Sequence, residues 1–237
     1  MGKQLYEGKA KRIYETDDAN VVRVEYKDDA TAYNAQKKAN IAGKGQLNNE
    51  ITSLLFEELR VAGIDNHFIE KLSDTEQLVQ RVQIIPLEVV VRNTIAGSLA
   101  KRLGIDEGTK LEQGIVEFYY KNDDLGDPLI NDDHVAILEA ATPEQATEIK
   151  EKAVQVNSML TKLFDEIGIE LVDFKLEFGL TPDGKILLAD EISPDTCRLW
   201  DKKTRQKFDK DVFRRDLGDL TEAYREILSR LEDTQHV

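Results

Sequence analysis

Charged side chains that suit phosphate chemistry gather in residues 170–201, ELVDFKLEFGLTPDGKILLADEISPDTCRLWD. Apolar and charged residues alternate at the start of this stretch, which predicts a β-strand with Asp173, Lys175 and Glu177 on one face. A turn signal, TPDG, follows, and then an apolar run that ends at Asp190. The stretch therefore predicts a β-hairpin that brings two carboxylates and an ammonium group together.

The register of this hairpin decides which side chains meet. With the turn centred on Pro182-Asp183, Glu177 lies opposite Leu188 and Lys175 lies opposite Asp190. Glu177 and Asp190 are then diagonal neighbours on one face of the sheet. Two carboxylates at that separation repel each other unless a cation lies between them, and a hard divalent ion that carries phosphate suits the pair. This arrangement predicts a phosphoryl-transfer site.

The same alternation is also typical of an ordinary strand whose charged face is exposed to water. The apolar face would consist of Val172, Phe174, Leu176 and Phe178. The second strand favours the catalytic interpretation, because an apolar run that ends in adjacent acids and continues into Ser193-Pro194-Asp195 is not typical of a solvated edge. Arg198 follows and adds a guanidinium group to the predicted site.

The elements that would position these residues alternate between strands and helices. Periodicity and caps predict a hairpin or two adjacent strands over 3–26, a loop over 28–45, a helix over 46–63, strands over 68–72, 76–84, 88–92 and 115–120, a short helix over 98–103, a long helix over 142–167 and a final helix or helix pair over 210–231. The long helix should start at Thr142, with Pro143 in its first turn and Gln145 completing a capping box.

A break at Ile85-Pro86-Leu87 predicts a hinge between two sheets. It divides the chain into a β-rich nucleotide-binding subdomain, 1–84, and an α+β subdomain with C-terminal helices, 85–237. Arg92, Gly97 and Ser98 follow the hinge, and a helix that begins at Ser98 as its N-cap would offer a phosphate cradle.

The composition narrows the classes of function. The chain has 237 residues, a net charge of −14 and one cysteine, Cys197. The acidic balance argues against a nucleic-acid-binding surface. The sequence contains no run of about twenty apolar residues, so we expect no membrane span. The first residues lack the apolar core of a secretion signal, and a single cysteine fits a reducing compartment, so we expect a cytoplasmic protein.

Six segments then identify a resemblance. They are LYEGKAKRIY, GKGQLNNEI, PLEVVVRNTIAGS, NDDLGDPLIND, LVDFKLEFG and ADEISPDTCRLWD, in this order from about Leu5 to Leu231. Together they resemble phosphoribosylaminoimidazole-succinocarboxamide synthase, the SAICAR synthetase family of purine biosynthesis, in its short bacterial form. Six ordered motifs over nearly the whole chain exclude chance similarity.

The resemblance implies an ATP-dependent ligase. Such an enzyme joins L-aspartate to the carboxylate of carboxylated aminoimidazole ribonucleotide (CAIR) through an acyl phosphate, giving the succinocarboxamide SAICAR, ADP and phosphate. The implied fold is α+β, with an antiparallel N-terminal sheet, a larger α+β part, an ATP cleft between them and a C-terminal helical segment. The resemblance also implies a homodimer, ATP and Mg²⁺ as cofactors, and small molecules as its other partners.

The resemblance assigns roles to individual residues. ATP should contact Lys9, Lys11, Val82, Lys121, Glu177 and Asp190, of which Glu177 and Asp190 hold Mg²⁺. CAIR should contact Arg92, Ser98, Asp173, Arg198 and Arg214, and Lys175 and Asp173 should act in catalysis. The adenine should meet the backbone of 83–85 and the side chains of Val24, Val82 and Leu188, with Asp127 in a nearby loop. Lys37 and Lys44 stay unassigned, as does Asn34, where some family members carry an acidic residue.

Two other functions fit part of this pattern. A small-molecule kinase would use Lys9, Lys11, Glu177 and Asp190 in the same way but release a stable phosphorylated product. A non-catalytic nucleotide sensor would bind ATP and Mg²⁺ without needing Lys175. The sensor would leave the predicted hairpin and phosphate cradle without a purpose.

Overall fold

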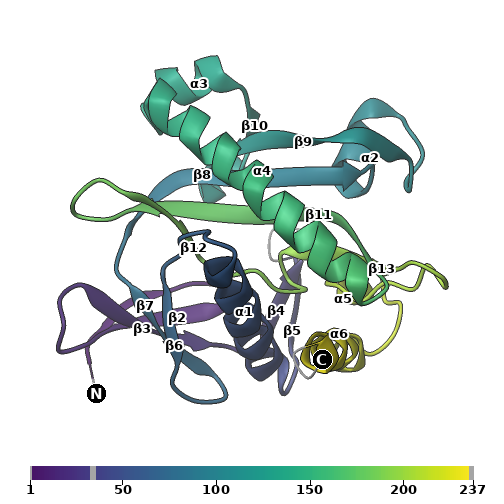
Figure 1. Cartoon of the computed structure of the whole chain (residues 1–237), viewed down its shortest axis with the longest axis horizontal. Helices are drawn as coiled ribbons and strands as arrows, with labels where there is room; N and C mark the ends of the chain where they lie inside the picture. Colours follow the sequence, from purple (N-terminus) through teal and green to yellow (C-terminus); the bar gives the residue numbers. More distant parts are fainter. Residues whose placement is uncertain (1, 33–35, 235–237) are drawn as a thin grey trace.

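The structure is a computed structural model that describes residues 2–32 and 36–234, and Figure 1 shows how their elements are arranged. A five-stranded antiparallel sheet has the order β1-β2-β3-β7-β6. Its strands are β1 (Gln4–Glu7), β2 (Lys11–Glu15), β3 (Val21–Tyr26), β7 (Glu76–Gln80) and β6 (Phe68–Lys71). The single hairpin or strand pair expected over 3–26 is therefore three strands.

A larger antiparallel sheet carries the charged stretch. Its order is β10-β9-β8-β11-β12, and β13 also pairs with β11. The strands are β8 (Gln83–Thr94), β9 (Lys110–Tyr120), β10 (Leu129–Ile130), β11 (Ile169–Leu180), β12 (Ile186–Ala189) and β13 (Cys197–Asp201). With the helices below, the two sheets confirm the expected α+β fold.

The helices pack against these sheets and against one another. They are α1 (Lys44–Val61), α2 (Gly97–Leu103), the 3₁₀ helix η1 (Asp123–Leu125), α3 (Asp132–Ile137), α4 (Pro143–Glu166), α5 (Asp211–Arg214) and α6 (Leu220–Thr234). In Figure 1, α4 crosses the larger sheet, whereas α1 and α6 lie beside each other. The final helix or helix pair is thus a pair.

One main core lies between the larger sheet and the helices. The helical stripe of α4 contributes the fully buried Ile149, Ala153, Val156, Leu160 and Phe164. The smaller sheet has its own cluster, built from Val22, Val24, Tyr26 and Val79. Val24 and Leu188, which were expected on the same adenine wall, therefore lie in different clusters, because Leu188 belongs to the main core.

The predicted hairpin forms, but its register is wrong by one residue. Glu177 pairs with Ala189 and Phe178 with Leu188. The loop closes through the Thr181 N–H, which donates to the Lys185 carbonyl at 2.9 Å. Gly184 lies at φ 85°, so the turn takes one more residue than the predicted two-residue turn.

The apolar face of β11 also changes phase near its start. Phe174, Leu176 and Phe178 join the main core as expected, but Val172 packs with Ala96 and Trp200 in a separate cluster. The cause is a bulge, because the register of β11 with β13 shifts between Leu171 and Asp173.

The predicted break at Ile85-Pro86-Leu87 is wrong, because β8 runs through Pro86 as one strand of 12 residues. Its register with β11 shifts between Glu177 and Gly179, and this irregularity accommodates a residue that cannot donate a ladder hydrogen bond. The chain instead leaves the smaller sheet after Gln80 and enters the larger one at Gln83. The division into subdomains 1–84 and 85–237 stays a prediction.

Two further expectations fail locally. The loop expected over 28–45 contains β4 (Asp29–Ala32) and β5 (Lys37–Asn40), which pair with each other, and Lys44 begins α1. Strands of four residues are too short to show a clear period. Asn34 lies outside the described residues. Ser98 is not the N-cap of α2, because the helix begins at Gly97 and its cap residue is Ala96.

The capping box of α4 is confirmed and yields a prediction. The Gln145 N–H donates to Thr142 Oγ1 at 3.2 Å, and the Thr142 N–H donates to Gln145 Oε1 at 2.9 Å. Thr142→Ala removes the first bond, so we expect a loss of about 1 kcal/mol in the free energy of unfolding, measured by urea denaturation. Thr161→Ala, on the exposed side of the same helix, should not destabilise the protein. Equal losses in both variants would contradict a contribution from the cap.

Candidate active site

Strand β11 positions the central side chains of the site. It pairs with β8 on one side and with β12 and β13 on the other, so its backbone is held along its length. Asp173, Lys175 and Glu177 share the face predicted from the alternation. This face is not solvated, since Asp173 is 4% exposed and Glu177 is 2% exposed. The alternative of an ordinary water-exposed strand is therefore wrong.

Lys175 is the centre of one group of charges. Its Nζ lies 2.6 Å from Glu177 Oε1, 3.4 Å from Glu88 Oε1 and 3.6 Å from Asp190 Oδ2. Lys121 Nζ lies 2.5 Å from the other oxygen of Glu177. Glu177 and Asp190 thus face one ammonium group, although the register differs from the predicted one.

Lys11 extends this group from the smaller sheet. It forms an ion pair with Asp190, and its Nζ lies 3.1 Å from Glu191 Oε1. We call the set the lysine–carboxylate cluster; its members are Lys11, Lys121, Lys175, Glu88, Glu177, Asp190 and Glu191. Because Lys11 comes from β2 and Asp190 from the end of β12, the cluster joins the two sheets.

Electrostatics keep Asp190 and Lys175 charged. Burial alone would raise the pKa of Asp190, but the charges of Lys11 and Lys175 outweigh it and hold that pKa well below its ordinary value. Burial would lower the pKa of Lys175, whereas the neighbouring Glu177 and Asp190 raise it well above its usual range. These groups therefore keep their charges at neutral pH.

A second group surrounds Asp173, two residues before Lys175. Arg92 Nη1 donates to Asp173 Oδ2 at 2.8 Å, and Arg198 Nη1 donates to the same oxygen at 2.8 Å. Arg92 also donates to Glu117 Oε2 at 2.7 Å and to Ser98 Oγ at 3.2 Å. The expected association of Arg92, Ser98, Asp173 and Arg198 in space is therefore observed.

Asp211 fixes the outer side of this group. Its carboxylate accepts hydrogen bonds from Arg198 Nε at 3.1 Å and from Arg214 Nη1 at 2.8 Å. We call Arg92, Arg198, Arg214, Asp173 and Asp211, with Ser98 and Glu117, the arginine cluster. Nearby, burial and the charge of Asp211 raise the pKa of Asp209 to about 7.

Three further residues, Lys9, Asp127 and Val82, make contacts with groups outside both clusters. Lys9 forms an exposed ion pair with Asp123 at 2.8 Å, whereas Lys11 points to Asp190, so the two lysines do not share a partner. Asp127 accepts a hydrogen bond from the Asn122 N–H at 2.8 Å, which shapes the loop after Lys121. Val82 lies against Gly179, where an added Cβ would approach Val82 Cγ2 to 2.4 Å.

Sequence reasoning missed several residues that hold the site. Glu88 pairs with Glu177 across the sheet, and its place in EVVVR gave no signal, because a lone acid in a strand is common. Lys44, which stayed unassigned, is buried and lies 2.7 Å from Asp195 Oδ2. Tyr224 donates to the other oxygen of Asp195 at 2.5 Å. This buried contact fixes the loop that leads to Arg198.

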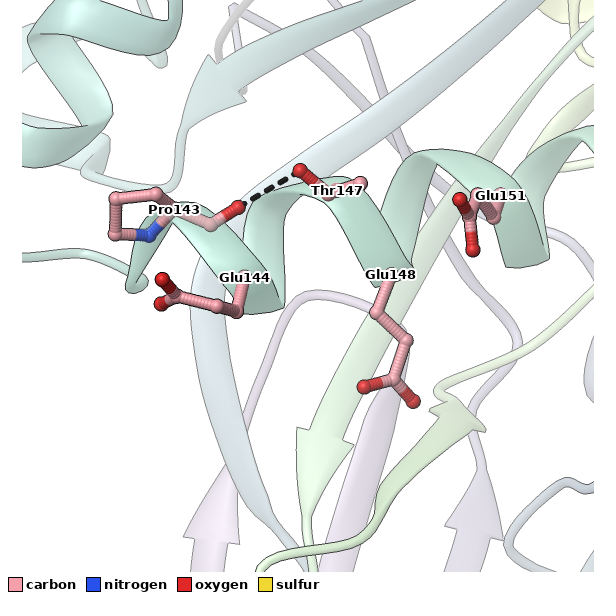
Figure 2. A pocket seen from close by; sticks show the side chains of 5 residues that line it. All are labelled: Pro143, Glu144, Thr147, Glu148 and Glu151. Carbon is pink, nitrogen blue, oxygen red and sulfur yellow. Dashed lines mark hydrogen bonds between the residues drawn. The ribbon is translucent and has the colours of Figure 1, made fainter.

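Two surface depressions lie away from both clusters. One, of about 520 Å³, is lined by Pro143, Glu144, Thr147, Glu148 and Glu151 along one side of α4, as Figure 2 shows. The other, of about 270 Å³, lies between α3 and α4. Neither lining includes a member of the lysine–carboxylate or arginine cluster.

The metal-binding capacity of the site is small. Within residues 2–32 and 36–234, no group of three or more His, Cys, Asp or Glu side chains is arranged to hold a metal ion. Glu177 and Asp190 supply two carboxylates. This set fits Mg²⁺ when phosphate oxygens and water complete its octahedral shell.

None of the described helices is long and apolar enough to cross a membrane.

Comparisons with known proteins identify the family of the chain. The family model of SAICAR synthetase matches residues 4–231. A phosphoribosylaminoimidazole-succinocarboxamide synthase of Bacillus mycoides is 65% identical over 233 residues, which cover 98% of each chain. The crystal structure of the enzyme from Ehrlichia chaffeensis is 46% identical, with a TM-score of 0.95, and the match covers 97% of this chain and 98% of that one.

A further solved structure carries a nucleotide. A SAICAR synthetase in complex with ADP is 50% identical, with a TM-score of 0.94, over 97% of each chain. The family match, the relatives and the folds agree over nearly the whole length of the sequence. The chain belongs to the SAICAR synthetase family.

Proposed function

We propose that this protein is the ATP-dependent ligase that joins L-aspartate to the carboxylate of CAIR and produces SAICAR, ADP and phosphate. The observation that carries the proposal is the match to the SAICAR synthetase family over residues 4–231. The ADP complex of a structural neighbour supports nucleotide use. The lysine–carboxylate cluster supplies charges of the kind that such a nucleotide requires.

The chemistry must first activate a carboxylate, because an amine cannot displace an oxide ion from it. Transfer of the γ-phosphoryl group of ATP to a carboxylate oxygen of CAIR gives an acyl phosphate and ADP. The amine of L-aspartate attacks the acyl carbon, the carbon–oxygen bond to phosphate breaks, and the ammonium group loses its proton. Phosphoryl transfer of this kind depends mainly on alignment and charge neutralisation.

The lysine–carboxylate cluster is assigned to the nucleotide. Lys11 and Lys121 neutralise phosphate oxygens, with Lys9 at the outer edge, and Glu177 and Asp190 hold Mg²⁺. Bound there, Mg²⁺ would supply positive charge that offsets the charge of the phosphates. Lys175 lies between the two carboxylates and two residues from Asp173. It is therefore placed to stabilise the phosphoryl group that moves from ATP to CAIR.

The arginine cluster is assigned to CAIR. Asp173 is held by Arg92 and Arg198, so its carboxylate has one orientation and can accept a hydrogen bond from the imidazole amine. The guanidinium groups of Arg92, Arg198 and Arg214, with the hydroxyl of Ser98, suit the ribose phosphate. A backbone contact of 83–85 and the Val82 side chain are assigned to adenine. We also propose a cytoplasmic homodimer, as the family resemblance implies.

The reaction itself separates this function from a kinase. With ATP, CAIR and L-aspartate present, we expect the protein to release ADP and SAICAR in equal amounts. A coupled assay measures ADP, and mass spectrometry measures SAICAR. A stable phosphorylated CAIR that accumulates at the same rate without L-aspartate would instead support the kinase. ATP binding without any turnover would support the nucleotide sensor.

Asp190→Asn tests the metal assignment. The change removes a negative ligand, so we expect kcat to fall on the order of a hundredfold or more, with a smaller change in KM for ATP. Asp183→Asn is the matched control, because Asp183 is an exposed acid in the turn between β11 and β12. Steady-state kinetics at several Mg²⁺ concentrations measures both. Near-normal turnover of Asp190→Asn would contradict the ligand assignment.

Arg198→Lys tests the assignment of the arginine cluster. Arg198 donates to Asp173 and Asp211 from different nitrogens, and a single ammonium group cannot reproduce this fork. We expect KM for CAIR to rise about tenfold or more, while KM for ATP changes little. Arg205→Lys, at a more exposed ion pair with Glu170, should leave both constants unchanged. Equal increases in both KM values would place Arg198 at the nucleotide.

A further inference from the structure

We propose that His67 is a positioning residue that fixes the main chain at Asp190 and thereby directs the Asp190 carboxylate into the lysine–carboxylate cluster. This inference rests on the function proposed above, because it gives Asp190 its role at the nucleotide. It adds a residue from the segment before β6, which contributes no side chain to either cluster. Three observations on the described residues support it.

The first observation is the backbone conformation of Asp190. This residue follows β12 directly and lies at φ 59°, in the left-handed region. Residues other than glycine rarely adopt this conformation, although aspartate tolerates it better than most. Surrounding contacts must therefore stabilise it, and such positions cluster at functional sites.

The second observation is that this conformation brings two adjacent acids to the same lysine. Consecutive side chains in a strand point to opposite faces, so two adjacent acids normally cannot reach one ammonium group. Lys11 nevertheless forms ion pairs with both Asp190 and Glu191. The left-handed residue interrupts the alternation, and Asp190 can then also face Lys175 at 3.6 Å. The cluster depends on this turn of the main chain.

The third observation is the contact that holds the turn. His67 Nε2 lies 3.2 Å from the carbonyl oxygen of Asp190, and a carbonyl can only accept, so Nε2 carries the hydrogen. The side chain is fixed in this orientation because His67 is 6% exposed and its ring packs edge-on against Phe56. In this contact the imidazole acts as a rigid hydrogen-bond donor to the Asp190 carbonyl.

The backbone of His67 is anchored as firmly as its ring. Its N–H donates to the Leu188 carbonyl at 2.8 Å, and its carbonyl accepts from the Gln80 N–H at 2.6 Å. Leu188 lies on β12 of the larger sheet, and Gln80 ends β7 of the smaller one. His67 therefore holds Asp190 at a fixed position relative to both sheets. A site assembled from β2, β11 and β12 requires such a fixed position.

The test compares His67→Phe, which keeps an aromatic ring but cannot donate, with His67→Gln, which keeps a donor. We expect His67→Phe to lower kcat about tenfold and to weaken binding of ADP with Mg²⁺ about tenfold by calorimetry, with KM for CAIR unchanged. His67→Gln should recover most of both losses. His134→Gln, at a histidine on α3, is the control and should behave as the wild type.

Combination with Asp190→Asn makes the test specific. If His67 acts through Asp190, adding His67→Phe to Asp190→Asn should lower kcat by less than twofold further. If His67→Phe does not fold, His67→Leu replaces it as the variant without a donor. Equal losses for ATP and CAIR, failure of His67→Gln to recover activity, or full additivity would each overturn the proposal.

Two outcomes separate this proposal from the proposed function. A slow Asp190→Asn beside a fast His67→Phe would overturn only the role of His67. A fast Asp190→Asn would remove the assigned role of Asp190, and the positioning role of His67 would fail with it. Formation of SAICAR by the wild type is measured independently of both.

Discussion

Burial of charge on strand β11 is the constraint on which the rest of the structure depends. One face of the strand enters the main core through Phe174 and Leu176, yet the other face is also buried, with Asp173 and Glu177 nearly inaccessible to water. A buried carboxylate without a partner costs several kcal/mol, so each acid needs a counter-charge at close range. The requirement explains why β2, β8 and β13 each contribute a basic residue that reaches β11 or the acid at the end of β12.

The spacing along β11 sets the geometry of the proposed reaction. Residues two apart in a strand lie on one face at about 6.6 Å, because each residue advances the chain by roughly 3.3 Å. Asp173 in the arginine cluster and Glu177 in the lysine–carboxylate cluster therefore flank Lys175 at equal intervals. A paired strand holds such intervals more rigidly than a loop does, which suits a transfer that depends on alignment.

The charges within each cluster also form ion pairs with one another. Lys175 and Lys121 both contact Glu177, and Arg92 and Arg198 both contact Asp173. Under the proposed function, a nucleotide with Mg²⁺ would bring both signs of charge and exchange these ion pairs, so no buried charge would be left alone. The buried contact of Lys44 with Asp195, and the bond from His67 to Asp190, hold the main chain on which this exchange depends.

The sequence by itself determined the features that arise from local periodicity and from short motifs. Alternation predicted the β11 strand and its charged face, the TPDG segment predicted a hairpin, and Thr142 with Gln145 predicted the start of α4. The six family segments identified the family and its chemistry. Each of these signals lies within a short stretch of the chain, where spacing alone decides which side chains share a face.

Only the tertiary structure decided how these pieces meet. The hairpin register changed by one residue because Gly184 adds a residue to the turn. Strand β8 continues through Pro86 because the register irregularity includes residues 85–87 of β8 itself, where no ladder donor is needed. The burial of Lys44 and the left-handed turn at Asp190 follow from contacts with Asp195 and His67, which lie 151 and 123 residues away in sequence. No local pattern encodes such contacts, because their energy comes from groups that only the folded chain brings together.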